Sequence, residues 1–141
     1  MSLRFLLDTN VVSEPIRPAP DPGVVDKIRR HQGSLALASV VWHELVFGVS
    51  RLTPSRRRDA IEDYLETVVA PGFPILSYDE GAADWHGRER ARLASAGRPP
   101  SFSDGQIAAI AQAHGLILVT ANRQHFEPFD GLRIEDWRDR R

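Results

Sequence analysis

Four short apolar runs, each followed by polar residues, constrain the fold of this chain more than any other feature. They cover residues 4–7, 35–38, 74–78 and 116–119, and a weaker run covers residues 132–134. Short runs that are apolar throughout are typical of the buried strands of a parallel sheet. Longer stretches with helical spacing separate them. The alternation predicts an α/β fold, with a central, mainly parallel sheet of four or five strands flanked by helices.

Capping residues predict where the helices begin. Such starts fall at Asp21-Pro22, Ser39, Thr53-Pro54, Asp79 and Ser101. In the helix after Thr53-Pro54, the apolar positions at helical spacing are Ile61, Tyr64, Leu65 and Val68. These four side chains are therefore predicted to face the core.

Composition limits the classes of protein further. A length of 141 residues with 42% hydrophobic residues fits one domain over residues 1–141. The absence of cysteine excludes disulfide frameworks, cysteine nucleophiles and cysteine-based zinc sites. No apolar run approaches the roughly 20 residues of a membrane span, and no secretory signal is visible, so we expect a cytoplasmic protein. The net charge of −1 does not by itself indicate a nucleic-acid-binding protein.

Polar side chains stand where ligands of open α/β sheets bind, beyond the carboxyl ends of the strands. Asp8 directly follows the first run, and Thr120 and Asn122 follow the fourth. Glu44 borders the buried face of its helix, and Asp104 points toward the core side from the first turn of another. These residues are therefore the candidates for a functional site.

Each candidate also has an ordinary structural explanation. Asp8 suits the N-cap of a short helix, and Asp104 lies in a Ser101-x-x-Asp104 pattern that matches a capping box. Glu44 taken alone is a boundary glutamate, and a polar pair after a strand can simply form a turn. Taken together, however, the oxygen ligands suit Mg²⁺ or Mn²⁺ and not zinc. A carboxylate cluster without a cation would repel itself, so the sequence indicates a metal site for phosphate chemistry.

Four segments in order carry a resemblance to a known family. They are Leu6-Leu7-Asp8-Thr9-Asn10-Val11-Val12-Ser13-Glu14-Pro15, Glu44-Leu45-x-x-Gly48-Val49, Asp104-x-x-Ile107-Ala108-Ala109-x-Ala111-x-x-x-Gly115 and Val119-Thr120-x-Asn122-x-x-x-Phe126. The chain resembles, over essentially its whole length, the PIN-domain ribonucleases of the VapC type from type II toxin–antitoxin pairs. Within them it is most similar to the FitB-like subgroup. The resemblance implies a PIN-like fold and a Mg²⁺-dependent endoribonuclease, with Mn²⁺ as a substitute.

The resemblance also implies roles for individual residues. Asp8 and Asp104 would bind the metal most directly, and Glu44 would complete the shell or hold a water. The residues expected to orient the carboxylates or the attacking water are Thr9, Asn10 and Thr120. The chain departs from the family at Asn122, where many members have aspartate, and this puts a second metal ion in doubt. The nearby side chains that could compensate are His125, Glu127 and Asp130.

Partners follow from the same resemblance. The expected substrate is single-stranded or looped RNA in a groove edged by arginine, with Arg88, Arg90, Arg92 and Arg98 as candidates. Arg56-Arg57-Arg58 is interpreted as a solvated surface run. A cognate, DNA-binding antitoxin of the VapB or FitA kind is expected to block the site with its tail, and the toxin is expected to form a homodimer within the complex. Candidate apolar contacts are Trp42, Trp85 and the Leu45/Val49 region, all of which core packing would also explain.

Two other functions remain open at this stage. A phosphohydrolase of the haloacid-dehalogenase type would use Asp8 as a nucleophile, but it needs a second aspartate where this chain has Asn10. The other is a PIN fold that has lost catalysis and only binds RNA or protein, which Asn122 in place of an acid keeps open.

Overall fold

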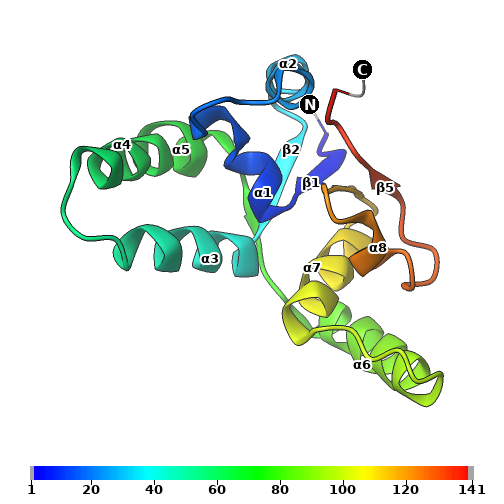
Figure 1. Cartoon of the computed structure of the whole chain (residues 1–141). Helices are drawn as coiled ribbons and strands as arrows, with labels where there is room; N and C mark the ends of the chain where they lie inside the picture. The colour runs from blue at the N-terminus through cyan, green and yellow to red at the C-terminus, as the bar shows by residue number, and fades with distance from the viewer. Residues whose placement is uncertain (1, 140–141) are drawn as a thin grey trace.

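A five-stranded sheet forms the centre of the computed structural model, which describes residues 2–139 (Figure 1). Its strands are β1 (Phe5–Leu7), β2 (Leu35–Ala38), β3 (Ile75–Leu76), β4 (Ile117–Val119) and β5 (Ile134–Glu135). They lie in the order β3-β2-β1-β4-β5, and all four pairings are parallel. The predicted α/β class and mainly parallel sheet are therefore confirmed. The weaker run at residues 132–134 overlaps β5 only at Ile134, and β5 lies at one edge of the sheet.

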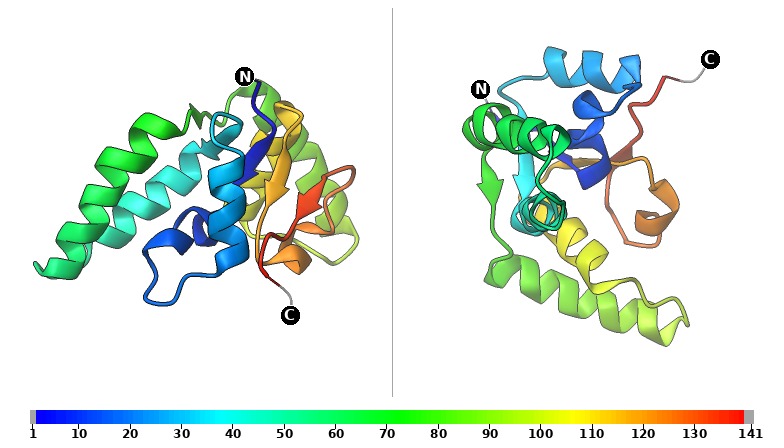
Figure 2. Two further views of the ribbon diagram at one scale, coloured as in Figure 1. Left: turned by 90° about the horizontal axis from the view of Figure 1, so that it is seen from above. Right: turned by 60° about the vertical axis from the view of Figure 1, so that its left-hand side comes forward.

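Helical segments connect the strands. They are α1 (Thr9–Val12), the 3₁₀ turn η1 (Glu14–Ile16), α2 (Pro22–Arg30), α3 (Ser39–Ser50), α4 (Arg56–Tyr64), the π-helical turn η2 (Leu65–Val69), α5 (Ala70–Gly72), α6 (Glu80–Ser95), α7 (Phe102–Ala113) and α8 (Arg123–Phe126). Helix α2 lies on one side of the sheet and α7 on the other, whereas α3 and α4 extend side by side away from it (Figure 2). No helix within residues 2–139 is both long and apolar enough to cross a membrane.

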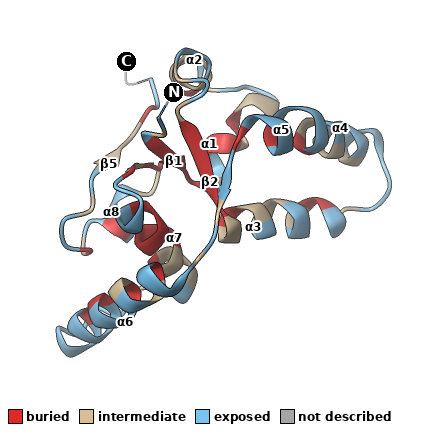
Figure 3. Cartoon of the chain, turned by 180° about the vertical axis from the view of Figure 1, so that it is seen from behind, coloured by how far each residue is buried: buried red, intermediate tan, exposed pale blue. Residues whose placement is uncertain are grey.

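The core lies between the sheet and α7. Every residue of β1 and β2 is buried, and α7 buries a continuous run from Ile107 to Ala111 against β2 and β4. Figure 3 shows this buried centre in red, with α6 as an outer layer that exposes much of its surface. Because α6 packs closely on α7, the position of α7 is determined from both sides.

Local capping explains most helix starts. The side chains of Asp21, Asp79 and Ser101 each accept a hydrogen bond from a backbone N–H in the first turn of the helix that follows. Two starts differ from the prediction. Ala38, not Ser39, occupies the N-cap of α3, because β2 runs into this helix without an intervening residue. Helix α4 begins at Arg56, after the Thr53-Pro54 pair, with Ser55 as its cap.

The predicted buried face of α4 is wrong at one position. Val68 is 49% exposed, whereas Leu65 and Val69 are buried. The cause is the π-helical turn η2, which holds an extra residue per turn and so moves the buried positions along the chain.

Candidate active site

Asp8 lies at the carboxyl edge of the sheet, between two neighbouring strands. It follows β1, and its backbone N–H donates to the carbonyl of Val119 at the end of β4 (2.9 Å). Asp8 is 7% exposed, and its carboxylate accepts hydrogen bonds from Thr9 N and from the hydroxyl of Thr120, both at 2.8 Å. Asp8 is therefore both the N-cap of α1 and a carboxylate at the candidate site, so its structural role as a cap does not exclude a functional role.

The electrostatics of the site oppose an isolated negative charge. Burial raises the pKa of Asp8, and the hydrogen bonds from Thr120 and Thr9 oppose this shift. The charges of Glu44 and Asp104 raise the pKa of Asp8 further, which shows that both carboxylates lie within its electrostatic reach. The three predicted acidic residues thus share one region, and a cation there would relieve their mutual repulsion.

Thr9 connects Glu44 to this region. The Thr9 hydroxyl donates a short hydrogen bond to Oε2 of Glu44, which reaches it from α3. Because Thr9 N also donates to Asp8, one residue positions two of the three carboxylates. Glu44 and Thr9 also line a groove of about 310 Å³ between α3, α4 and the segment from α1 to η1, whose walls include the predicted contacts Leu45 and Val49.

Asp104 enters the site from the first turn of α7. Its backbone N–H donates to the Ser101 hydroxyl (3.2 Å), so the serine half of the predicted capping box is present. Its side chain keeps 24% of its surface exposed, and Oδ2 lies 3.6 Å from Nδ1 of His125 on α8. His125 is therefore the nearest basic partner of this carboxylate within residues 2–139. From the sequence, His125 was predicted only as a side chain that could compensate for Asn122.

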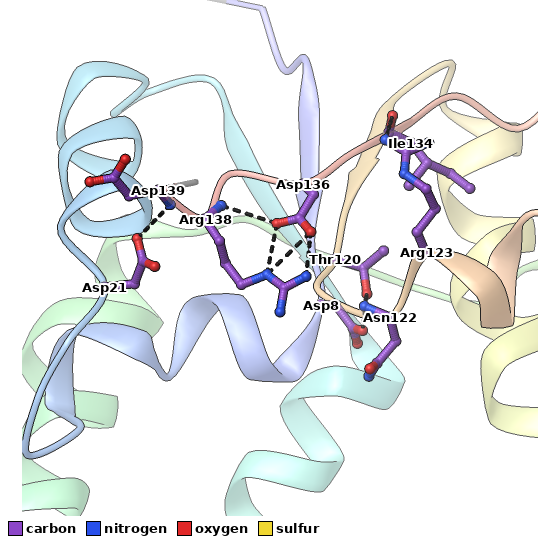
Figure 4. A network of polar contacts seen from close by, with 9 residues as sticks. All are labelled: Asp8, Asp21, Thr120, Asn122, Arg123, Ile134, Asp136, Arg138 and Asp139. Atoms are coloured by element: carbon purple, nitrogen blue, oxygen red, sulfur yellow. Dashed lines mark hydrogen bonds and ion pairs between the residues drawn. The ribbon is translucent and has the colours of Figure 1, made fainter. Parts of the chain in front are cut away.

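Asn122 is brought to the same edge by Thr120. The Thr120 hydroxyl accepts from the backbone N–H of Asn122 at 3.0 Å while it donates to Asp8, as Figure 4 shows. The Asn122 side chain makes no capping hydrogen bond although it precedes α8. Asn10, the other predicted amide, is exposed on α1 and makes no hydrogen bond to the three carboxylates within residues 2–139. Both of their predicted catalytic roles stay predictions.

A segment near the C-terminus borders the site on the far side from α7. Asp136 binds the guanidinium of Arg138 through both carboxylate oxygens, and Asp21 accepts from the backbone N–H of Asp139 at 2.9 Å (Figure 4). A Cβ at Gly23 would lie 2.8 Å from backbone atoms of this segment, so α2 and the segment touch closely. No motif in the sequence indicated this contact, because its partners lie more than 100 residues apart.

The carboxylate oxygens at this edge of the sheet are the type of ligand that Mg²⁺ prefers, but the carboxylates are too far apart to enclose an ion without water. Within residues 2–139 no group of three Asp, Glu or His side chains is close enough to hold an ion by itself. Mg²⁺ usually keeps several waters and binds through one or two carboxylates, so a closed protein cage is not required. Asp8 and Asp104, supported by Glu44, would supply oxygen ligands of that kind.

The predicted arginine rim is only partly available. Arg88 pairs with Asp84 on its own helix, and the Arg90 guanidinium lies over the Phe102 ring. Arg92 pairs with the buried Glu89 and donates to the carbonyl of Pro128. The fourth candidate, Arg98, forms no ion pair within residues 2–139 and lines a pocket beside Asp104.

Other predicted neighbours have structural roles. Arg58, from the arginine run, pairs with Glu62 and donates to the carbonyl of Leu52. The Asp130 backbone N–H donates to Glu89. Glu127 and Asp130 are exposed, as are Arg56 and Arg57. The candidate interface residues Trp42, Leu45 and Trp85 are partly buried against the core, and Val49 belongs to it.

A family profile described as PIN domain matches residues 5–131. This match covers most of the chain, including every residue of the site just described. The five-stranded parallel sheet also agrees with the PIN-like fold that the sequence resemblance implies. The chain belongs to the PIN-domain family.

Individual relatives narrow this assignment. The tRNA(fMet)-specific endonuclease VapC of Shigella flexneri is 38% identical over 136 residues, which cover 96% of this chain and 98% of that protein. The crystal structure of FitAcB from Neisseria gonorrhoeae matches with a TM-score of 0.85 at 32% identity, over 92% of this chain and 95% of that one. That of DNA-bound VapBC from Salmonella typhimurium has a TM-score of 0.83 at 32% identity, over 96% and 98%. Within the PIN-domain family, the chain is a VapC-type ribonuclease.

Proposed function

We propose that this protein is the toxin of a type II toxin–antitoxin pair and cleaves RNA phosphodiester bonds with water in a Mg²⁺-dependent reaction. The observation that carries the proposal is the buried Asp8, whose pKa is raised by burial and by two further carboxylates at the same edge of the sheet. A nuclease that uses oxygen ligands needs such a cluster, and the relatives include an endonuclease of 38% identity. Because that relative is a tRNA(fMet)-specific endonuclease, tRNA(fMet) is the first substrate to test.

In the proposed reaction, different residues bind the ion, orient its ligands and contact the attacking water. Asp8 and Asp104 would hold the ion, and Thr120 and Thr9 keep the Asp8 carboxylate in one orientation. Thr9 also fixes Glu44, which would accept a hydrogen bond from the attacking water. A bound Mg²⁺ would lower the pKa of that water and neutralise charge on the scissile phosphate. The water oxygen would bond to phosphorus and the bond from phosphorus to the leaving oxygen would break. The attacking water would release a proton to solvent, the leaving oxygen would take one up from solvent, and no covalent bond to the protein would form.

Partners are part of the same proposal. The FitAcB and DNA-bound VapBC structures are complexes, so we expect a DNA-binding antitoxin to bind this chain as well. Glu44 and Thr9 line the groove beside α3 and α4, so a partner segment lying in it would contact Glu44. A homodimer within such a complex stays a prediction.

The purified chain, freed of any antitoxin, is expected to cleave total cellular RNA when Mg²⁺ or Mn²⁺ is added and to stop when EDTA removes the ion. Mapping of the cleaved ends identifies the RNA. Inducible expression in a bacterium should arrest growth. Binding of RNA without cleavage at any Mg²⁺ or Mn²⁺ concentration would instead support the binding-module alternative that Asn122 leaves open.

Thr120→Val is expected to raise the Mg²⁺ concentration needed for half-maximal activity by about 10- to 100-fold, the usual effect of removing a group that orients a metal ligand. The Thr120 hydrogen bond lowers the pKa of Asp8, so its loss should also move the acid limb of the pH–activity profile to higher pH. Thr67→Val removes a comparable threonine hydrogen bond, to the Asp63 carbonyl, at an exposed place in η2 and serves as the control. An unchanged Mg²⁺ requirement and acid limb in Thr120→Val would show that Thr120 does not act through Asp8.

A further inference from the structure

A second pocket shares Asp104 with the candidate active site. It has a volume of about 370 Å³ and is open to solvent, between the loop that joins α6 to α7 and the helix α8. In Figure 1 the loop lies at the lower right, below α8. Asp104 and His125 both line this pocket, and Nδ1 of His125 lies 3.6 Å from Oδ2 of Asp104. A group bound in this pocket would therefore lie next to the proposed site of cleavage.

Polar contacts around the buried Glu89 and at the end of α6 hold the walls of the pocket in place. Glu89 is only 8% exposed and accepts hydrogen bonds from Arg92 and from the backbone N–H of Asp130. Arg92 in turn donates to the carbonyl of Pro128, one of the lining residues. On the opposite wall, the backbone N–H of Arg98 donates to the Leu93 carbonyl at the end of α6. The pocket is thus formed before a ligand arrives, which lowers the entropic cost of binding.

The lining combines flat apolar surfaces with two uncommitted polar side chains. Pro99, Pro100 and Pro128 supply the apolar faces. Arg98 has no ion pair within residues 2–139, unlike Arg88 and Arg92, which are paired on α6. Gln124 is exposed, and no hydrogen bond to its amide occurs in the described part of the chain.

These groups match the parts of a single nucleotide. An unpaired base has flat apolar faces and a polar edge that an amide can contact through hydrogen bonds. The phosphate that follows it is the preferred partner of a guanidinium. Proteins recognise single-stranded RNA by this combination of a base-contacting surface, polar contacts to the base edge and cations along the backbone.

We propose that this pocket binds the nucleotide adjacent to the cleaved phosphodiester in single-stranded RNA, with Arg98 contacting its phosphate and Gln124 the edge of its base. The proposal rests on the proposed ribonuclease function and adds a subsite that gives it sequence preference. Arg98 is then the arginine of the predicted rim that touches substrate.

The binding arm of the test uses Asp8→Asn as a background in which RNA is not cleaved. A fluorescently labelled single-stranded RNA of seven nucleotides is titrated at several salt concentrations, and its anisotropy is recorded. Adding Arg98→Ala should weaken binding about fivefold or more and reduce the slope of log affinity against log salt by about 0.7, the value for one phosphate contact on a single strand. Arg30→Ala is the matched control, because Arg30 pairs with Asp26 on α2, on the far side of the sheet.

The cleavage arm uses Gln124→Ala without the Asp8 change. Its cleavage sites in total RNA should lose preference at the position next to the cut, while the rate at the best wild-type site falls less than tenfold. Equal affinity and salt slope for Asp8→Asn with and without Arg98→Ala, or an unchanged site preference in Gln124→Ala, would overturn the subsite. Failure of the wild-type chain to cleave any RNA would instead overturn the proposed function, so the two results are read separately.

Discussion

Replacing Asp8 with asparagine is expected to abolish RNA cleavage and, at the same time, to stabilise the metal-free protein. Asparagine keeps an oxygen for the Thr9 N–H, but it lacks the negative charge that would hold a cation. Loss of metal-assisted activation of water should lower the cleavage rate by about 10³-fold or more, while RNA binding remains.

The gain in stability follows from the sign of the pKa shift. The pKa of Asp8 is raised in the folded chain by burial, so the folded chain holds this proton more tightly than the unfolded chain does. The stabilisation from the neutral carboxyl is fully present below the ordinary pKa of 3.8 and is lost as the pH rises through the raised value. At neutral pH the wild type therefore carries a buried negative charge that the asparagine variant does not.

Thermal unfolding in EDTA and in Mg²⁺ measures both effects. In EDTA at neutral pH the variant should unfold at a higher temperature than the wild type. Mg²⁺ at 100 times its dissociation constant should stabilise the wild type by about 2.7 kcal/mol, or roughly 8 °C, and the variant hardly at all. Asp84→Asn, an exposed carboxylate on α6, is the control and should match the wild type in both solutions. A variant that Mg²⁺ stabilises as strongly as the wild type would show that Asp8 does not hold the ion.

The parts of this fold that were predictable from sequence are those decided by neighbouring residues. The run from Leu35 to Ala38 is apolar throughout and forms a fully buried strand. Asp79 and Ser101 cap the helices that follow them, because a short polar side chain satisfies nearby backbone N–H groups whatever the rest of the chain does. The position of Asp8 at the end of β1 was predictable for the same reason.

The parts that were not predictable depend on contacts between distant residues. The sequence shows polar residues after β1 and after β4, but not that these strands are neighbours, which is what brings Thr120 to Asp8. Likewise, the sequence alone predicts Arg92 to be an exposed cation on a helix. Its contact with the Pro128 carbonyl could not be predicted, because Pro128 lies 36 residues further along the chain. The roles of His125 and Arg98 also appear only when α8 and the loop after α6 are placed beside α7.

Gly105→Ala is expected to destabilise the protein strongly, although alanine is normally the better helix former. A Cβ at Gly105 would lie 2.0 Å from Nε2 of His86, which projects from α6 onto α7. His86 is 1% exposed, and Tyr78 holds its other ring nitrogen at 2.8 Å, so the ring has no room to move. Overpacking of this kind should cost about 3 kcal/mol and lower the unfolding temperature by roughly 9 °C. Because Asp104 is the preceding residue, RNA cleavage should fall as well.

Two comparisons separate this contact from a general intolerance of alanine. Gly87 lies next to His86 on α6 with nothing within 4 Å of its missing Cβ, so Gly87→Ala should leave the protein as stable or up to about 1 kcal/mol more so. In a chain that already carries His86→Ala, Gly105→Ala should cost less than about 1 kcal/mol, since the clash is gone. Urea unfolding of the wild type, the two single variants and the double variant gives the coupling free energy of this cycle. Gly105→Ala could instead lower the free energy of unfolding by the same amount with and without the His86 ring. That result would show that contact with His86 is not the reason for glycine at position 105.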